Sequence, residues 1–211
     1  MSDEVPFEGS AIVSCGTLRP ELTQLSKEGF LNPDLLLFTA PGLHEWQPEL
    51  KKQLLNQLSK AKERSQRVIA VYGERCYLDP LDPSGDVDWL LRKVGGDISR
   101  VCAKNCVDML ASAEEREAIA GGQKIYWLTP GWFLYWKMIF KDFDKGLANE
   151  TFPVNDKAVL LDPFNMFEEV SQKSPEKILE FSDFMGIAIE PYPVTLNRLK
   201  GLLAQEIQSK G

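Results

Sequence analysis

The sequence AIVSCGTL, residues 11–18, is a short apolar run that stops at a cysteine and a glycine, and residues 20–28 after it have the apolar spacing of a helix. The same order recurs along the chain, with strands predicted at 11–15, 34–39, 67–72, 98–102, 124–129, 158–162 and 187–190, and helices at 20–28, 48–65, 87–94, 105–119, 132–143, 175–185 and 195–209. Such alternation is typical of a parallel sheet covered by helices. We therefore predict a single α/β domain over residues 1–211, a three-layer, Rossmann-like sandwich with a mostly parallel sheet.

The composition excludes several classes of partner. With 44% hydrophobic residues, the 211-residue chain can bury a core without disulfides. Its 24 Lys and Arg against 31 Asp and Glu give a net charge of −7, which repels nucleic acid and anionic lipid, so we expect neither as a partner. No apolar run reaches the ~18 residues of a membrane span. The N-terminal MSDEVP is acidic where a signal peptide is basic, so we expect a cytoplasmic protein.

Four predicted strand ends lead into loops that hold a soft or borderline metal ligand: Cys15, His44, Cys76 and Cys106. The carboxyl ends of parallel strands share one edge of a sheet, so these side chains should lie near one another. Thiolates and a neutral imidazole suit zinc, or alternatively an iron-sulfur cluster. We predict a metal site on these four residues, within the loops of residues 15–132.

Other residues near the site have less specific roles. We expect Gly16, Gly42 and Gly73 to allow tight turns and close approach to a bound group. A helix starting near Cys106 would lower the pKa of its thiol. Each cysteine taken singly is equally well explained as a small core residue, and Cys102, in or at the end of a strand, is the one we favour for that role. Its spacing to Cys106 would equally allow it to be an extra ligand.

An aromatic segment follows the fifth predicted strand. Thr129, Gly131 and Trp132 fall on the same sheet edge and could wall a pocket for a small-molecule ligand. The neighbouring Trp127, Tyr135 and Trp136 are better explained as core residues. Three charged residues adjoin the predicted ligands and could orient them or move protons, although surface salt bridges are the favoured explanation: Glu74, Arg75 and Asp108.

Several motifs resemble those of domain-of-unknown-function family 1638: SCGTL at 14–18, PGLH at 41–44, YG at 72–73 with Cys76, NCVDML at 105–110, LTPGW at 128–132 and ILEF at 178–181. The family motifs fall on Cys15, His44, Cys76 and Cys106, and leave out Cys102. The resemblance implies that the protein occurs alongside corrinoid-dependent methyltransferase systems. It therefore also implies a corrinoid protein or methyltransferase as partner. Where relatives tend to have Asp-Thr-Gly, this sequence reads DPF at 162–164, so no ligand contact is carried over there.

These observations support more than one function. A zinc ion could activate a thiol or another methyl acceptor in corrinoid-linked one-carbon metabolism, which would make the protein a metal-dependent methyltransferase or its accessory. An iron-sulfur cluster on the same residues would serve electron transfer or reductive activation. A corrinoid-protein binding module would need only a structural metal, and a protein whose cysteines are core residues would need none. The sequence assigns no catalytic residue.

Overall fold

The computed structural model describes residues 7–208. The acidic start of the chain, on which the expected absence of a signal peptide depends, and the predicted helix end at Ser209 therefore lie outside the described residues. Within the described range, no helix combines the length and the apolar character needed to cross a membrane.

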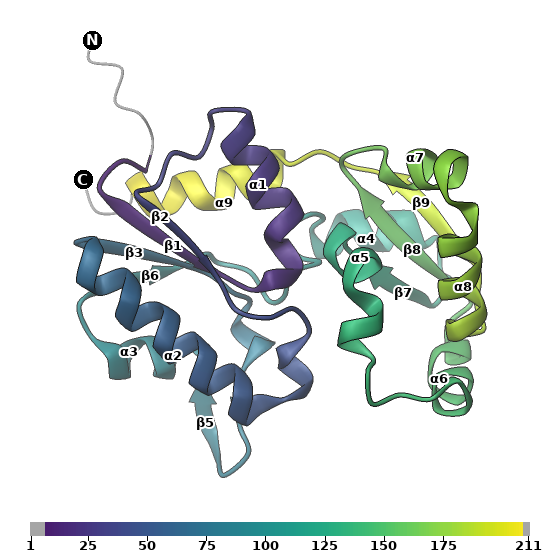
Figure 1. The fold of residues 1–211 in the computed structure, drawn as a ribbon, viewed down its shortest axis with the longest axis horizontal. Helices are drawn as coiled ribbons and strands as arrows, with labels where there is room; N and C mark the ends of the chain where they lie inside the picture. Colours follow the sequence, from purple (N-terminus) through teal and green to yellow (C-terminus); the bar gives the residue numbers. More distant parts are fainter. Residues whose placement is uncertain (1–6, 209–211) are drawn as a thin grey trace.

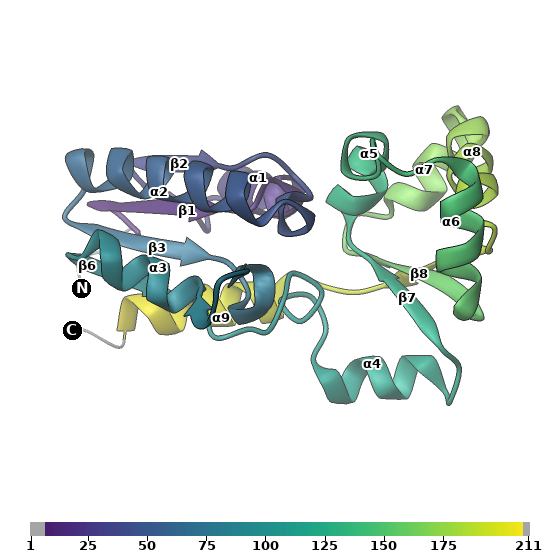
Figure 2. The same ribbon diagram turned by 90° about the horizontal axis from the view of Figure 1, so that it is seen from below.

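The seven predicted strands are all present, and they are divided between two parallel sheets (Figures 1 and 2). The first sheet has the order β2-β1-β3-β6 and contains β1 (Ser10–Ser14), β2 (Leu35–Phe38), β3 (Arg67–Val71) and β6 (Asp97–Arg100). The second has the order β7-β8-β9 and contains β7 (Ile125–Leu128), β8 (Lys157–Asp162) and β9 (Ile189–Pro193). The predicted α/β class with parallel strands is confirmed.

Helices cover both faces of the first sheet. Side chains alternate across a strand, so Ile12 faces one side of β1 while Ala11 and Val13 face the other. Ile12 lies in the same core as residues of α1 (Arg19–Lys27) and α9 (Asn197–Gln208), whereas Ala11 and Val13 share a core with α2 (Gln47–Arg64) and α3 (Val87–Val94). These helices and the sheet form three layers, with the sheet in the middle.

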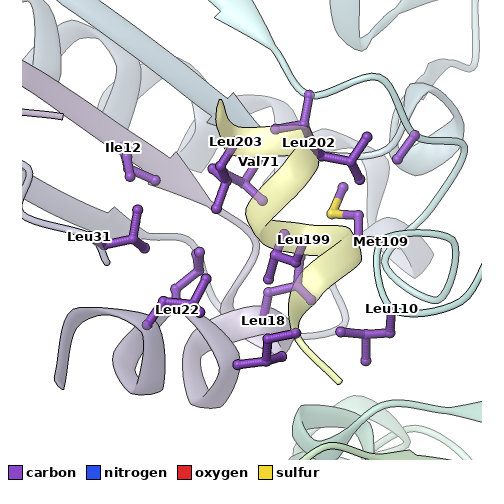
Figure 3. Packing of buried hydrophobic residues seen from close by; sticks show 14 of the residues in the cluster. Ile12, Leu18, Leu22, Leu31, Val71, Met109, Leu110, Leu199, Leu202 and Leu203 are labelled. Carbon is purple, nitrogen blue, oxygen red and sulfur yellow. The ribbon is translucent and has the colours of Figure 1, made fainter. Parts of the chain in front are cut away.

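The C-terminal helix belongs to the first sheet although the chain reaches it from the second. After β9 the chain returns, and α9 places Leu199, Leu202 and Leu203 in one core with Leu18 and Leu22 (Figure 3). All five side chains are at most 8% exposed. This return ties the two halves of the chain together, because the first core is incomplete without residues from the C-terminus.

A second, aromatic core supports the second sheet. Leu128 and Leu160 of the sheet pack with Phe133 of α5 (Pro130–Ile139) and with Phe181 and Met185 of α8 (Pro175–Met185). Trp136 stacks on Phe181 with ring centroids 4.9 Å apart, in the core role expected for it. Two short helices near this core were not expected from the sequence: α6 (Lys145–Thr151) and α7 (Met166–Lys173).

Two further segments differ from their predicted structure. Between the strand predicted at 67–72 and the helix predicted at 87–94, where no strand is predicted, the chain forms a hairpin of β4 (Leu78–Asp79) and β5 (Asp82–Asp86). The helix predicted at 105–119 is wrong in its first half, because residues 105–111 form turns and α4 (Ala113–Ala120) starts after a capping box at Ser112. Asn105 Oδ1 accepts the amide of Asp108, and the distant Arg198 donates to the Asp108 carbonyl, so side-chain bonds replace helical ones.

Candidate metal centre

The four residues predicted as ligands follow the four strands of the first sheet. Cys15 comes directly after β1, and His44 lies in the 3-10 turn η2 (Leu43–Glu45) after β2. Cys76 ends the turn η3 (Glu74–Cys76) after β3, and Cys106 lies in the turns after β6. Because these strands are parallel, all four loops leave the same edge of the sheet.

Glycines let the loops at this edge touch one another. A Cβ added at Gly16 would overlap the carbonyl of Thr39, and one added at Gly73 would overlap the backbone at Asn105. Gly42 has a φ of 75°, in the left-handed region that favours glycine. The close approach predicted at Gly16 and Gly73 is thus an approach of one loop to the next, which brings the cysteine-bearing loops together.

Cys15 lies among hydrogen-bond donors. Its Sγ is 3.0 Å from Thr17 Oγ1, and it also accepts hydrogen bonds from the backbone amides of Thr17 and Gly42. Burial raises the pKa of the Cys15 thiol, and these hydrogen bonds oppose the increase because they stabilise the thiolate.

Cys76 and Cys106 are close enough to Cys15 to repel it electrostatically. Burial and then the nearby Cys15 raise the pKa of Cys76 to about 12. Burial, followed by Cys76 and Cys15, raises the pKa of Cys106, so the lowered pKa expected for this thiol is wrong. No helix begins at Cys106, and desolvation dominates there instead. All three cysteine residues are half-buried.

His44 lies next to Trp132. Its ring is 5.2 Å from that of Trp132, and its Nε2 is 3.1 Å from Glu45 Oε1. The Trp132 indole in turn donates a hydrogen bond to the Cys106 sulfur, so the indole contacts both His44 and Cys106. Across residues 7–208, no three His, Cys, Asp or Glu side chains are already gathered closely enough to hold a metal ion.

The second half of the chain contributes α5 to this edge. Thr129 is buried, and its Oγ1 accepts the amide of Trp132, which caps the helix. A Cβ at Gly131 would overlap the Thr17 carbonyl oxygen, so the start of α5 lies directly against the turn η1 (Gly16–Leu18) that follows Cys15. Trp132 is 7% exposed and packs mainly within the aromatic core.

Other polar residues near the site have structural partners. Asp108 forms ion pairs with Arg198 at 3.2 Å and Arg116 at 3.6 Å, although it is buried and not at the surface as expected. Glu74 and Arg75 are exposed. Cys102 is also exposed and lies beyond the end of β6, so it is no core residue, contrary to the role we favoured for it.

Arg100, which the sequence did not single out, organises the loop before Cys106. It pairs with Asp88 at 2.7 Å and donates to the carbonyls of Tyr72, Val101 and Ala103. Its charge lowers the pKa of Cys76, against the larger effect of burial. It supplies positive charge beside a group of thiols.

Glu21 is a second residue that the sequence reasoning missed. It is 0% exposed, burial raises the pKa of its carboxyl to about 8, and its charge raises the pKa values of Cys15 and Cys106. The helical spacing of the sequence held the signal. Glu21 lies three residues after Leu18 and four before Leu25, on the buried stripe of α1.

Comparison with known proteins identifies the family of the chain but no individual similar protein. No curated protein and no solved structure matches the chain. The family described as "Protein of unknown function (DUF1638)" matches residues 38–203. His44, Cys76 and Cys106 lie within the matched range, whereas Cys15 and Glu21 precede it. Since the match covers well over half of the chain, the protein belongs to the DUF1638 family.

Proposed function

We propose that this protein binds a soft metal ion, zinc in the first instance, through Cys15, Cys76 and Cys106, with His44 as the predicted fourth ligand. The observation that carries the proposal is the placement of three half-buried cysteines in three loops at one sheet edge. Their mutual repulsion opposes ionisation, and a bound cation would reverse that effect.

The donor chemistry of the site fits such an ion. Three sulfurs and an imidazole are soft or borderline ligands, and the glycine contacts between loops keep their backbones close. Binding requires the thiol side chains to turn toward one another, and it requires His44 to leave Glu45. Zinc, when bound, would lower the pKa of a coordinated thiol or water.

Neighbouring residues would stabilise the thiolate form of each cysteine in the metal-free protein. Thr17 and Gly42 donate hydrogen bonds to Cys15, and Arg100 favours the charged form of Cys76. Trp132 donates to Cys106. Each thiol therefore has at least one polar neighbour that stabilises its thiolate, although burial acts against all three.

The test is metal analysis with an ultraviolet-visible spectrum, on protein purified without oxygen. We expect about one zinc per chain and no visible colour, as in tetrahedral sulfur-rich zinc sites. Cys76→Ala should lose the metal, while the exposed Cys102→Ala serves as the matched control and should keep it. Full occupancy in Cys76→Ala would overturn the ligand set, and several irons with a brown colour would replace zinc by a cluster.

A cytoplasmic role in corrinoid-linked one-carbon metabolism is the broader part of the proposal, and the family resemblance supports it. A tetrahedral site with four protein ligands is closed, so in such a role a small thiol would have to replace one of them on the ion. Its thiolate would then take a methyl group from a methylated corrinoid, giving a thioether and a cob(I)alamin. The test incubates the protein with methylcobalamin and a small thiol and follows the visible spectrum of the corrinoid. Zinc-dependent demethylation that Cys76→Ala lacks is the expected result, and a rate equal to that of free zinc would contradict it.

A further inference from the structure

A cleft of about 490 Å³ lies where the two halves of the chain meet, beside the carboxyl edge of the first sheet. One wall is formed by the loop after β2 and the start of α2, and the other by the end of α5 and the residues just after it (Figures 1 and 2). A Cβ added at Gly42 would lie 2.8 Å from Ile139 Cγ1, so the two walls are in direct contact. None of the residues that line the cleft is a cysteine or a histidine, so the cleft is distinct from the predicted metal ligands.

Hydrogen bonds hold the first wall in place. Gln53 Oε1 accepts the amide of Ala40 at 2.9 Å, and the amide of Trp46 donates to the Leu43 carbonyl at 2.8 Å. These bonds fix the loop after β2 against the start of α2. A cleft that is fixed in this way, with a volume in the range of ~300–1,000 Å³, is typical of a site for a small molecule.

Two large apolar side chains are exposed in the cleft. Trp46 is 44% exposed on one wall, and Met138 is 54% exposed on the other. Pro41, Leu43 and Ile139 add further apolar lining. Apolar side chains that gather in one hollow, rather than lying singly on the surface, mark a place where a ligand covers them. We therefore expect the occupant to have an apolar part.

The charges in the lining indicate what the rest of the ligand carries. Among the described residues, Lys141 has no ion-pair partner, and its Nζ lies 5.0 Å from the centroid of the Trp46 ring. The lining carboxylate, Glu49, is already paired with Lys52 at 3.8 Å and accepts a hydrogen bond from Gln53 at 2.9 Å. The cleft thus combines an apolar surface with one unpaired positive charge.

We propose that this cleft binds a small amphipathic carboxylic acid, with its apolar part against Trp46 and Met138 and its carboxylate on Lys141. The lysine ammonium has three donors, and a carboxylate accepts from it through a charge-assisted bond. A neutral apolar molecule would leave this charge without a partner, and a cation would be repelled by it. The inference goes beyond the proposed metal site and does not depend on it.

The experiment compares octanoate with octanamide, which has the same chain length and no charge. Each is titrated into the full-length protein by calorimetry at low ionic strength, because salt screens an exposed lysine. Octanoate should bind at one site per chain, and at least ~5-fold more tightly than octanamide. Lys141→Gln should remove this preference, and Trp46→Ala should weaken the binding of both compounds. Lys137→Gln is the matched control, since Lys137 Nζ also lies near a tryptophan ring, 5.4 Å from that of Trp136, but is paired with Glu180 outside the cleft.

Three results would overturn the proposal. The first is octanoate that does not bind, or binds no more tightly than octanamide. The second is octanoate binding that both Lys141→Gln and Trp46→Ala retain, which would place it elsewhere. The third is a dimer in sedimentation that Trp46→Ala converts to a monomer, because a second copy of the chain would then cover the cleft. If Trp46→Ala loses its helical circular dichroism, Met138→Gln replaces it, and unchanged binding of both compounds in that variant contradicts the proposal.

Discussion

The carboxyl edges of the two sheets use their polar residues in different ways. At the second edge, Asp162 ends β8 and accepts three backbone amides, from Phe164, Met166 and Phe167, at 2.8 to 3.0 Å. Thr129 caps α5 in the same manner. At the first edge, the three thiols repel one another, and the Glu21 carboxyl has no hydrogen-bond partner among the described residues.

The difference shows how a structural polar residue can be told from one available for chemistry. Asp162 already has the donors that a carboxylate needs, so its burial requires no further explanation. Glu21 is buried at least as deeply and lacks them. In a fold with two similar parallel edges, the edge with unmet polar groups is the better place for a ligand.

The largest expected effect on the free energy of unfolding is at the carboxyl edge of the second sheet. Asp162→Ala would leave three amide donors without an acceptor, and at ~1.5–2 kcal/mol for each charge-assisted bond it should cost about 5 kcal/mol of unfolding free energy. Asp162→Asn keeps Oδ1, which accepts from Phe164 and Met166, and should cost less. Urea denaturation measures both, and a cost under ~1 kcal/mol for Asp162→Ala would remove the contrast between the edges.

The next effect concerns the pH dependence of stability at the first edge. Burial raises the pKa of Glu21 from 4.5 to about 8, so the folded, metal-free protein favours the protonated carboxyl. Its contribution to stability is complete below the unfolded pKa and is lost as the pH rises through about 8, by roughly 5 kcal/mol in total.

Glu21→Gln should abolish that contribution. The difference in unfolding free energy between the metal-free variant and the unmodified chain should therefore grow steadily from pH 4.5 to pH 8, with the variant the more stable at the upper end. Denaturant melts at several pH values give the difference. A constant difference over this range would mean that the carboxyl finds a partner at neutral pH.

A smaller effect tests the contact between the two halves of the chain. In Gly131→Ala the new Cβ would overlap the Thr17 carbonyl oxygen and lie 2.6 Å from its carbonyl carbon, and neither can rotate away. We expect a loss of roughly 2–3 kcal/mol, together with weaker zinc binding, because Thr17 belongs to the turn that supports Cys15.

The control for this substitution is Gly201→Ala in α9. A Cβ at Gly201 meets no atom within 4 Å, so alanine there should raise stability by about 0.5–1 kcal/mol through helix propensity alone. Equal stability of the two alanine variants would show that the halves of the chain can separate at Gly131 without cost.

Most of the fold was predicted from short-range patterns in the sequence. Each strand of the two parallel sheets was found to within a few residues, because an apolar run bounded by turn residues depends only on neighbours in the sequence. The β4–β5 hairpin has no such run and was missed. The division into two sheets could not be predicted in this way. β6 and β7 are consecutive predicted strands, yet neither run shows that one pairs with β3 and the other with β8.

The sequence analysis missed features around the predicted site where distant residues decide the local structure. The turns at 105–111 depend on Arg198, which follows Asp108 by 90 residues in the sequence. The thiols were placed on one edge from their strand ends alone, but Glu21 belongs to a helix and was therefore passed over. Its position on the buried stripe of α1 could have been predicted from the sequence, because a charged residue between Leu18 and Leu25 breaks an apolar pattern.

The smallest expected effect is at Cys102, the exposed thiol of the first edge. Cys102→Ala should change stability by less than ~0.5 kcal/mol, because the side chain has little packing to lose. Its exposure also makes it the first thiol to react with iodoacetamide, ahead of Cys15, Cys76 and Cys106 with their raised pKa values. Mass spectrometry of labelled peptides gives the order. Rapid labelling of Cys76 in Cys102→Ala would show that its thiolate is accessible without metal, and no cation would then be needed to offset the repulsion among the thiols.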